Sequence, residues 1–446
     1  MFRKNMDQLI KWADEKSRKP LVLMGARQVG KSYLVSEFGE QHFKKMHAFN
    51  FEKDKRLHPL FLSVKEPGKI IRQLSQLYGS PIDETKDLIF FDEIQACPEA
   101  ITSLKYFAED LPHAFICAAG SLLGLSLGES SFPVGKVNFL KIFPLDFQEY
   151  MQAFEQKNLF DEYILNPNQG LHEIIWPYLI DYLITGGLPE IVKNFVQMNK
   201  ENRNDRYEKV RELQEVLILG YLADMAKHCG KENAMFLERI WRNAAEQVGQ
   251  EKASKYKFKN IFPGKRGYED FMNPIDWLKK AGILYQTPLI DSVKIPLSIQ
   301  KKENAFKLFV FDIGIMNALA GLSHQHLLDY NFSHKGFIAE NFVLQEMMST
   351  LFPNRPVYTY KSSQSEIEFI VEYNGVVLPI EVKAGFNLKA KSLSTFIQQH
   401  KPKNALRVSR KTLIYPDDLK RDIIIHDWPL FLISQAISKI ALPIRR

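Results

Sequence analysis

The sequence predicts an α/β protein of several domains, and three observations support this prediction. A complete G-x-x-x-x-G-K-S loop at residues 25–32 stands between a short apolar run and a helical stretch. A hydrophobic run at residues 87–93 ends in two carboxylates, and an Asn-Gly pair at 374–375 separates two strand-like runs. The chain has 446 residues, which is too long for a single core and predicts about two to four domains.

The loop at 25–32 has the flanks that a phosphate-binding loop requires. Residues 21–24 form an apolar run of strand length, and residues 33–38 continue as a helical stretch. Glycines at 25 and 30 let successive N–H groups converge on phosphate oxygens beside a helix N-terminus. We expect Lys31 to reach the β- and γ-phosphates of ATP and Ser32 to hold Mg²⁺. A glycine-containing turn before a helix is the plainer alternative. The predicted nucleotide-binding set is Gly25, Ala26, Arg27, Gln28, Val29, Gly30, Lys31, Ser32 and Tyr33.

A hydrophobic strand over 87–93 ends in Asp92 and Glu93, which places both carboxylates at the carboxyl edge of a sheet beside the loop. Asp92 suits a Mg²⁺ site shared with Ser32, and Glu93 suits a general base that activates the attacking water. In isolation, an Asp-Glu pair after a strand is more often a solvated turn. The loop at 25–32 favours the catalytic interpretation here.

A third apolar run, residues 114–119, leads to Gly120 and Ser121. Ser121 at this strand end could sense the γ-phosphate or position the water. A plain strand-end turn explains the same residue equally well.

The order of strand, loop, helix, acidic strand and polar strand resembles the AAA-type branch of P-loop ATPases. Residues 135–150 are similar to the "GR…YPLSFxEF" stretch of a large prokaryotic AAA ATPase family, and residues 307–314 resemble its "KLYFxDxGL" element. Lys136 stands where that family has arginine, and lysine lacks the planar fork of a charge-stabilising arginine finger. The resemblance covers nearly the whole chain and implies ATP and Mg²⁺ as cofactors.

Residues 183–190 match the "GGxP" signature of the same family. The resemblance implies a helical lid that brings Gly187 and Pro189 to the nucleotide. A helix cap is the plainer alternative, because glycine followed closely by proline ends helices in many proteins.

Composition and charge limit the classes of protein. Hydrophobic residues make up 45% and charged residues 25%, as in ordinary globular proteins. The three cysteines are widely spaced and form no metal or disulfide framework. The charged N-terminal segment is unlike a signal peptide, and no apolar run reaches membrane-spanning length, so we expect a cytoplasmic protein. The net charge of +7, with a stretch of lysines and aromatics at 252–268, favours DNA as a partner, although solvated loop lysines are the default explanation.

A β-hairpin is predicted around Asn374-Gly375, the pair typical of a two-residue type I′ turn. Counting outward from this turn places Glu368 opposite Glu381 and Glu366 opposite Lys383. Alternation puts the four charged residues on one face and leaves an apolar face on the other. That face consists of Ile367, Phe369, Val371, Leu378, Ile380 and Val382.

Two opposed carboxylates repel unless a positive charge stands between them, and a divalent metal would supply it. Glu368 with Glu381-Val382-Lys383 resembles the PD-(D/E)XK nuclease core, which implies that the two acids hold Mg²⁺ and that the lysine helps orient or activate water. The helix predicted over 336–342 would add Glu340. The nuclease pattern prefers aspartate where this chain has Glu368. The alternative is a solvated face on which Glu366 pairs with Lys383.

Four domains follow from these segments. We predict an AAA+ P-loop ATPase core with an αβα fold at 1–150, a helical lid at 151–200, a winged-helix-like domain at 201–330 and a restriction-endonuclease-like (PD-(D/E)XK) α/β domain at 331–446. The middle domain is inferred from a helix that ends at Gly282 and is followed by a strand.

The predicted function is Mg²⁺-dependent ATP hydrolysis coupled to action on DNA. The alternative is a slow nucleotide-dependent switch or scaffold that binds a protein partner and carries an inactive nuclease-like domain. A homo-oligomer is compatible with both.

Overall fold

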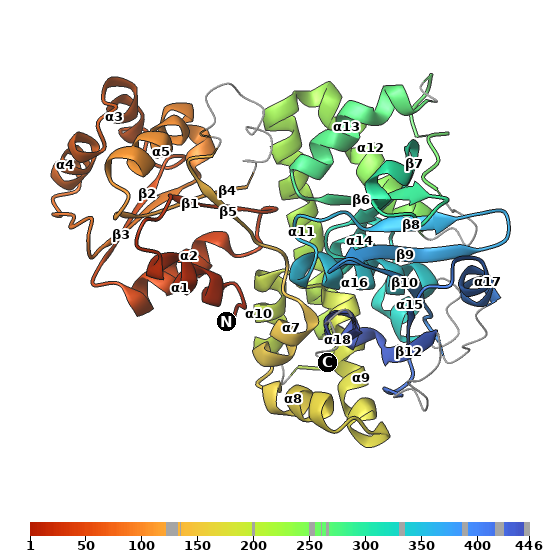
Figure 1. The fold of residues 1–446 in the computed structure, drawn as a ribbon. Coiled ribbons are helices and arrows are strands. Elements are labelled where there is room, and N and C mark those ends of the chain that lie inside the picture. The colour runs from red at the N-terminus through yellow and green to blue at the C-terminus, as the bar shows by residue number, and fades with distance from the viewer. Residues whose placement is uncertain are drawn as a thin grey trace. The chain divides into compact units, whose positions relative to one another are not determined.

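The computed structural model describes residues 1–121, 133, 135–198, 201–248, 255–259, 261–264, 267–329, 335–385, 391–414 and 423–440 (Figure 1). The chain divides into two compact units. The first comprises residues 1–143 with 280–282, and the second comprises 144–279 with 283–446. Both units combine helices with a β-sheet, which confirms the predicted α/β class.

The first unit is built on a parallel sheet, which in the described ranges has five strands in the order β2-β3-β4-β1-β5. The strands are β1 Leu21–Met24, β2 Met46–Asn50, β3 Leu88–Asp92, β4 Phe115–Gly120 and β5 Asn138–Lys141. The helices are α1 Met6–Asp14, α2 Lys31–His42, α3 Leu57–Ser63, α4 Pro67–Leu77 and α5 Pro98–Asp110, with a short 3₁₀ turn η1 at Ile94–Ala96.

Continuous apolar strands explain this sheet. Residues 21–23 of β1 and 88–91 of β3 are buried, as expected for strands covered by helices on both faces. Proline at the first position of α4 and α5 fixes where each helix begins. Because β4 lies between β1 and β3, the loop at 25–32, Ser121 and Asp92 follow three adjacent parallel strands and share one sheet edge.

The second unit contains a mixed sheet, which in the described part of the chain has seven strands in the order β12-β11-β10-β9-β8-β6-β7. The strands are β6 Leu284–Ile290, β7 Lys301–Val310, β8 Tyr358–Lys361, β9 Glu366–Tyr373, β10 Val376–Val382, β11 Asn404–Ser409 and β12 Ile424–Pro429. The helices before β6 are α7 Phe147–Ala153, α8 Lys157–Leu165, α9 Gln169–Thr185, α10 Pro189–Gln197, α11 Arg203–Cys229, α12 Lys231–Val248 and α13 Tyr268–Lys280. The later helices are α14 Ile313–Leu319, α15 His324–Leu328, α16 Lys335–Thr350, α17 Lys391–His400 and α18 Ile433–Ile440, with 3₁₀ turns η2 Leu297–Gln300 and η3 Leu430–Leu432.

Residues 268–310 form the predicted helix and strand, followed by a second strand. Gly282, with φ +77°, follows α13 and precedes β6, as the sequence predicts. Strands β6 and β7 pair antiparallel, and β6 also pairs with β8. The sheet therefore takes strands from both sides of the predicted domain boundary at 330.

The aromatic residues of the 252–268 stretch pack against one another. Tyr256 is buried and stacks on Phe306 with the ring centroids 6.2 Å apart, and Phe258 contacts Tyr256, Phe306 and Phe271. Tyr256 therefore belongs to the interior, whereas Phe258 is half-buried, and the role of this stretch in binding DNA stays a prediction. Lys252, Lys265 and Arg266 lie outside the described residues.

Buried polar side chains of α16 satisfy backbone groups of several neighbouring elements. Asn341 accepts from the N–H of Val310 at 3.0 Å and donates to the carbonyl of Val310 at 2.9 Å. The Oε1 atom of Gln345 accepts from the N–H of Ile313 at 2.8 Å, and Oε1 of Glu346 accepts from the N–H of Phe147 at 2.8 Å. Helix α16 therefore links the end of β7 to the starts of α14 and α7.

Asp312 forms a second link of this kind. Its Oδ2 accepts from the N–H of Gly187 at 2.7 Å, and its Oδ1 accepts from the N–H of Ile315 at 3.0 Å, which caps α14. The side chain is fully buried. Burial raises the pKa of Asp312 to about 6, although these backbone donors lower it.

Within the described residues, no helix combines the length and the apolar character that crossing a membrane requires.

We expect the free energy of unfolding to depend on the protonation of Asp312. Its pKa is about 6 in the folded protein against 3.8 ordinarily, so the folded state binds the proton more tightly. Its contribution is therefore fully present at pH values below 3.8 and is lost as the pH rises through 6. Asp312→Asn should remove about 1 to 2 kcal/mol of stability change between pH 5 and pH 8.

Chemical denaturation followed by tryptophan fluorescence measures this change, because four of the five tryptophans lie in the second unit: Trp176, Trp241, Trp277 and Trp428. Asp205→Asn, at an exposed position of α11, is the control. An identical pH dependence in the wild type and Asp312→Asn would contradict the assignment.

Candidate functional site

The phosphate-binding loop is a tight turn between β1 and α2 that requires glycine. Gly25 has φ +152° and Gly30 has φ +89°, and Gln28 also adopts a positive φ of 64°. A Cβ atom on Gly25 would collide with the carbonyl oxygen of Ile142. The predicted loop residues all lie in this turn or in the first turn of α2, where exposed Tyr33 follows Ser32.

Lys31 is the first residue of α2, and its side chain folds back over the loop. Its Nζ donates to the carbonyl oxygens of Gly25 at 3.0 Å and Ala26 at 2.8 Å. Burial lowers the pKa of Lys31 to about 8, whereas Glu93 and Asp92 favour its charged form. Lys31 therefore interacts electrostatically with both predicted acids, Asp92 and Glu93.

Ser32 and Asp92 meet as predicted. The hydroxyl of Ser32 donates to Oδ1 of Asp92 at 2.9 Å. Asn50, at the end of β2, donates from Nδ2 to Oδ2 of Asp92 at 3.0 Å and fixes the carboxylate from the other side. A hydroxyl and a carboxylate are hard oxygen ligands, so this donor set fits Mg²⁺. The sequence analysis did not predict a role for Asn50. Its place at the end of β2, the strand next to β3, could have indicated one.

Glu93 leaves the end of β3 through a left-handed backbone conformation with φ 49°. Its N–H donates to Oδ1 of Asp92 at 3.1 Å, and its Oε2 accepts from Nε2 of Gln95 at 2.6 Å. These contacts hold the carboxylate outside the strand, at the edge that carries the loop. A strained backbone at a non-glycine residue is typical of functional sites.

Arg3 supports the loop through its backbone carbonyls, and the sequence analysis did not predict this role. Its Nη1 donates to the carbonyl of Val29 at 3.1 Å, its Nη2 donates to the carbonyl of Phe143 at 2.7 Å, and the residue is only 5% exposed. In the sequence, Arg3 is one of several charges in the N-terminal segment before and within α1, and no pattern separates it from solvated residues.

For Ser121, Gly187 and Pro189, the structure gives the position in the fold but no contact with a nucleotide. Ser121 directly follows β4, between the strands that carry the loop and Asp92. Gly187 donates its N–H to Asp312 and accepts from the N–H of Leu145 at 2.7 Å, and a side chain there would collide with Leu145. Pro189 begins α10. Packing explains both residues of the glycine-proline element, and their contact with a nucleotide stays a prediction.

The predicted hairpin in the second unit is confirmed. Strands β9 and β10 pair from Tyr373–Val376 to Phe369–Ile380 in the predicted register, and Asn374 and Gly375 both have positive φ, as a type I′ turn requires. Every residue of the predicted apolar face is buried.

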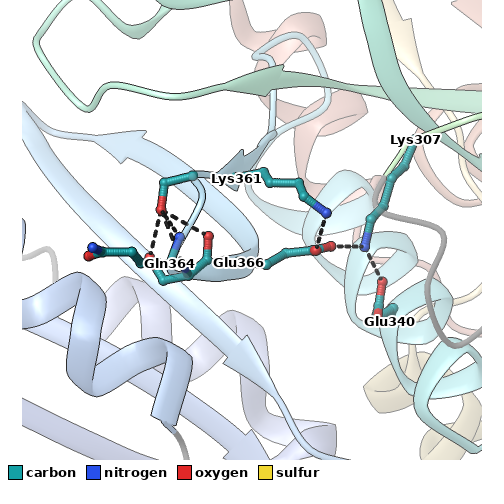
Figure 2. Close-up of polar contacts among 7 residues, drawn as sticks. Lys307, Glu340, Lys361, Gln364 and Glu366 are labelled. Carbon is teal, nitrogen blue, oxygen red and sulfur yellow. Dashed lines mark hydrogen bonds and ion pairs between the residues drawn. The ribbon is translucent and has the colours of Figure 1, made fainter.

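The charged face contains a cation that sequence reasoning missed. Lys307 of β7 pairs with Glu340 of α16 at 3.2 Å and with Glu366 of β9 at 3.4 Å (Figure 2). Lys361 of β8 pairs with the other oxygen of Glu366 at 3.2 Å. The alternative of a solvated face paired Glu366 with Lys383, but Lys383 pairs instead with Glu381, two residues earlier, at 3.2 Å.

We call Glu340, Glu366, Glu368 and Glu381 the acidic cluster. Glu340, Lys383 and Glu381 all act electrostatically on Glu368. Burial, followed by the charge of Glu340, raises the pKa of Glu368 to about 8, with Lys383 opposing. Its Oε2 accepts from the N–H of Val382 at 3.2 Å.

Glu381 is the most buried member of the cluster, with 1% of the residue exposed. Burial raises its pKa, whereas Lys383 lowers it. Its Oε2 has no hydrogen-bond partner among the described residues. Over the same residues, no group of three or more His, Cys, Asp or Glu side chains is arranged to hold a metal.

We expect Gly25→Ala to destabilise the first unit by about 2 to 4 kcal/mol, because the new methyl group must displace Ile142 and the φ of residue 25 disfavours a side chain. Hydrogen exchange of peptides from residues 21–43 measures the local opening free energy. Gly79→Ala is the control, since Gly79 also has a positive φ but open space around it. Equal effects of both substitutions would contradict the proposed collision.

Comparison with protein families divides the chain into three parts. Residues 17–151 match the family described as AAA domain. Residues 177–326 and 335–431 match two different domains of unknown function. The first match confirms the predicted AAA-type unit, whereas the nuclease-like assignment of the C-terminal part stays a prediction.

Relatives along the full length are distant. An uncharacterized protein of Methanocaldococcus jannaschii is 24% identical over 413 residues, covering 91% of this chain and 84% of the relative. The ORC1 protein of Aeropyrum pernix in complex with DNA is 10% identical with a TM-score of 0.31, covering 72% of this chain and 93% of that chain. Cdc6p of Pyrobaculum aerophilum is 11% identical with a TM-score of 0.28, covering 73% and 94%. Likeness at this level does not indicate a shared function.

The family match and the geometry of the loop agree. Residues 17–151 are similar to AAA domains, and they carry a phosphate-binding loop in which Ser32 meets Asp92 as predicted.

Proposed function

We propose that the protein is a Mg²⁺-dependent ATPase whose second unit acts on DNA. The observation that carries the ATPase proposal is the contact of Ser32 with Asp92 at 2.9 Å, directly beside Lys31 and Glu93. A phosphate-binding lysine, a metal-binding hydroxyl and carboxylate, and a second carboxylate are the parts that ATP hydrolysis needs.

Each residue has a distinct role in this proposal. The loop N–H groups and Lys31 bind the phosphates, and Glu93 accepts the proton of the attacking water. Ser32 and Asp92 would hold Mg²⁺, which supplies positive charge against the charge that develops on the phosphate oxygens. Asn50 and Gln95 orient the two carboxylates through the hydrogen bonds described above.

Action on DNA rests on the resemblance of Glu368, Glu381 and Lys383 to the nuclease pattern. It is supported by the pairing of Lys383 with Glu381 and by their electrostatic action on Glu368. The ion pairs of Lys307 favour the second candidate function. In that candidate the protein is a nucleotide-dependent switch or scaffold for a protein partner, its C-terminal unit does not cut, and self-association is compatible with the role.

Substitutions in the loop and at Glu93 separate binding from turnover. Lys31→Ala should weaken ATP binding, whereas Glu93→Gln should keep ATP binding and lower kcat by about 10²-fold or more, because it removes only the base. Calorimetric titration with ATP and Mg²⁺ and a phosphate-release assay measure the two effects. Glu40→Gln, on the exposed side of α2, is the control. Unchanged turnover in Glu93→Gln would rule out Glu93 as the base.

Adding DNA tests the second unit. We expect duplex or single-stranded DNA to raise the steady-state ATP turnover of the wild type several-fold, with both forms assayed in parallel and the DNA recovered for analysis. Cuts that disappear in Lys383→Ala would assign cleavage to the charged face. Turnover that is indifferent to DNA, together with intact DNA, would support the switch and contradict the DNA-directed proposal.

A further inference from the structure

The stretch that follows the β9–β10 hairpin is basic over a long run of sequence. Residues 384–416 contain no aspartate or glutamate, although the whole chain has 52 of them. Helix α17 lies within this stretch, and its first residue, Lys391, is exposed. Lys401 and Lys403, just after the helix, are also exposed. Among the described residues, no carboxylate forms an ion pair with any of these three lysines. The positive charge of the stretch is therefore not balanced locally.

The outer side of α17 has the composition of a phosphate-binding surface. Ser394 and Gln398 are exposed and lie at helical spacing from Lys391. On the inner side, Leu393 and Phe396 are buried in a core cluster. Lysine, serine and glutamine are among the side chains that commonly contact nucleic-acid phosphates. The exposed side of α17 is thus polar and cationic and carries no acid.

The connection between β6 and β7 lies at the same end of the sheet as the C-terminal end of α17. Ile290, the last residue of β6, is the register partner of Tyr360 on β8 and of Lys301 on β7. The hydroxyl of Tyr360 forms a hydrogen bond with Nε2 of His400, the last residue of α17, at 2.8 Å. Because adjacent strands lie about 4.8 Å apart, the backbones of Lys301 and Tyr360 are about 10 Å apart. The start of β7 therefore lies near the end of α17.

This connection adds further cations to the surface. Lys294 and Lys301 are exposed, and Lys302 pairs with Asp291 at 2.7 Å. Leu297, in the middle of the connection, is buried in the same core cluster as the inner side of α17, so both segments are anchored in one interior. We call the exposed lysines of the two segments the basic face: Lys294, Lys301, Lys391, Lys401 and Lys403.

We propose that the basic face binds the phosphate backbone of duplex DNA. The inference rests on the proposed action on DNA and adds the surface through which the second unit holds it. At a rise of 1.5 Å per residue, Lys391 and Lys401 lie about 15 Å apart along the helix axis, comparable to the major-groove width of about 12 Å. Cations at the two ends of α17 can therefore contact phosphates of both strands. Phosphate contacts carry no sequence information, so binding is independent of sequence and falls steeply with salt.

A short fluorescent duplex, titrated with the full-length chain at several salt concentrations, tests the proposal by anisotropy. ATP and divalent ions are left out, so that neither turnover nor cleavage contributes. Replacing all three lysines of the α17 segment, as Lys391→Gln, Lys401→Gln and Lys403→Gln, should weaken binding at least tenfold. It should also reduce the slope of log K against log salt by about 3, one for each phosphate contact.

A second triple variant is the matched control. Lys157→Gln, Lys193→Gln and Lys231→Gln remove the same charge from exposed positions on α8, α10 and α12, and this variant should bind as the wild type does. Equal losses in the two triple variants, or no loss in the first, would overturn the basic face and leave the action on DNA standing. A wild type that does not bind DNA would contradict both.

A lipid surface is the competing occupant, because Ile295 and Ile299 of the β6–β7 connection are 53% and 74% exposed. Co-sedimentation with phosphatidylserine vesicles tests it. Binding to the vesicles but not to DNA would overturn the proposal. Circular dichroism checks that each variant folds. If the first triple variant does not fold, Lys401→Gln alone replaces it and should lower the salt slope by about 1.

Discussion

The second unit depends on one constraint: backbone N–H groups that are buried at the ends of its elements must find acceptors. Asn341, Gln345 and Glu346 supply acceptors from α16, and Asp312 supplies two more at the start of α14. Each of these side chains reaches an element that is distant along the chain. Buried hydrogen bonds thus link α7, Gly187, the end of β7, α14 and α16.

The first unit solves a different problem, which is to hold a loop of exposed N–H groups in a fixed shape. Gly25 allows the loop to approach Ile142 closely, and Arg3 holds the carbonyls of Val29 and Phe143 together. Asn50 and Gln95 then fix the directions of the two carboxylates. Side chains outside the loop, those of Arg3, Asn50 and Gln95, therefore support the candidate phosphate site.

The sequence predicted those features whose determinants are close together along the chain. The loop at 25–32 and the hairpin around Asn374-Gly375 have short, fixed spacings, and both have the predicted geometry. Arg3, Asn50 and Lys307 were missed because each acts on residues that only the tertiary fold brings near. Lys307 was assigned to a family element, and nothing in that stretch indicated Glu340 or Glu366. The pair of Glu366 and Lys383, which the solvated-face alternative required, is wrong for the same reason, since other strands supply lysines to Glu366.

Strand β7 and the turn after it carry two of these distant contacts. Lys307 holds carboxylates of the acidic cluster, and Asp312 holds the N–H of Gly187 in the glycine-proline element. A hydrogen-bonded strand cannot stretch, because its rise per residue is fixed by its backbone geometry. A displacement of Gly187 that preserves its hydrogen bond would therefore pull on β7, and the ammonium group of Lys307 would move with it. Strand β7 would thus transmit a displacement of the glycine-proline element to the acidic cluster.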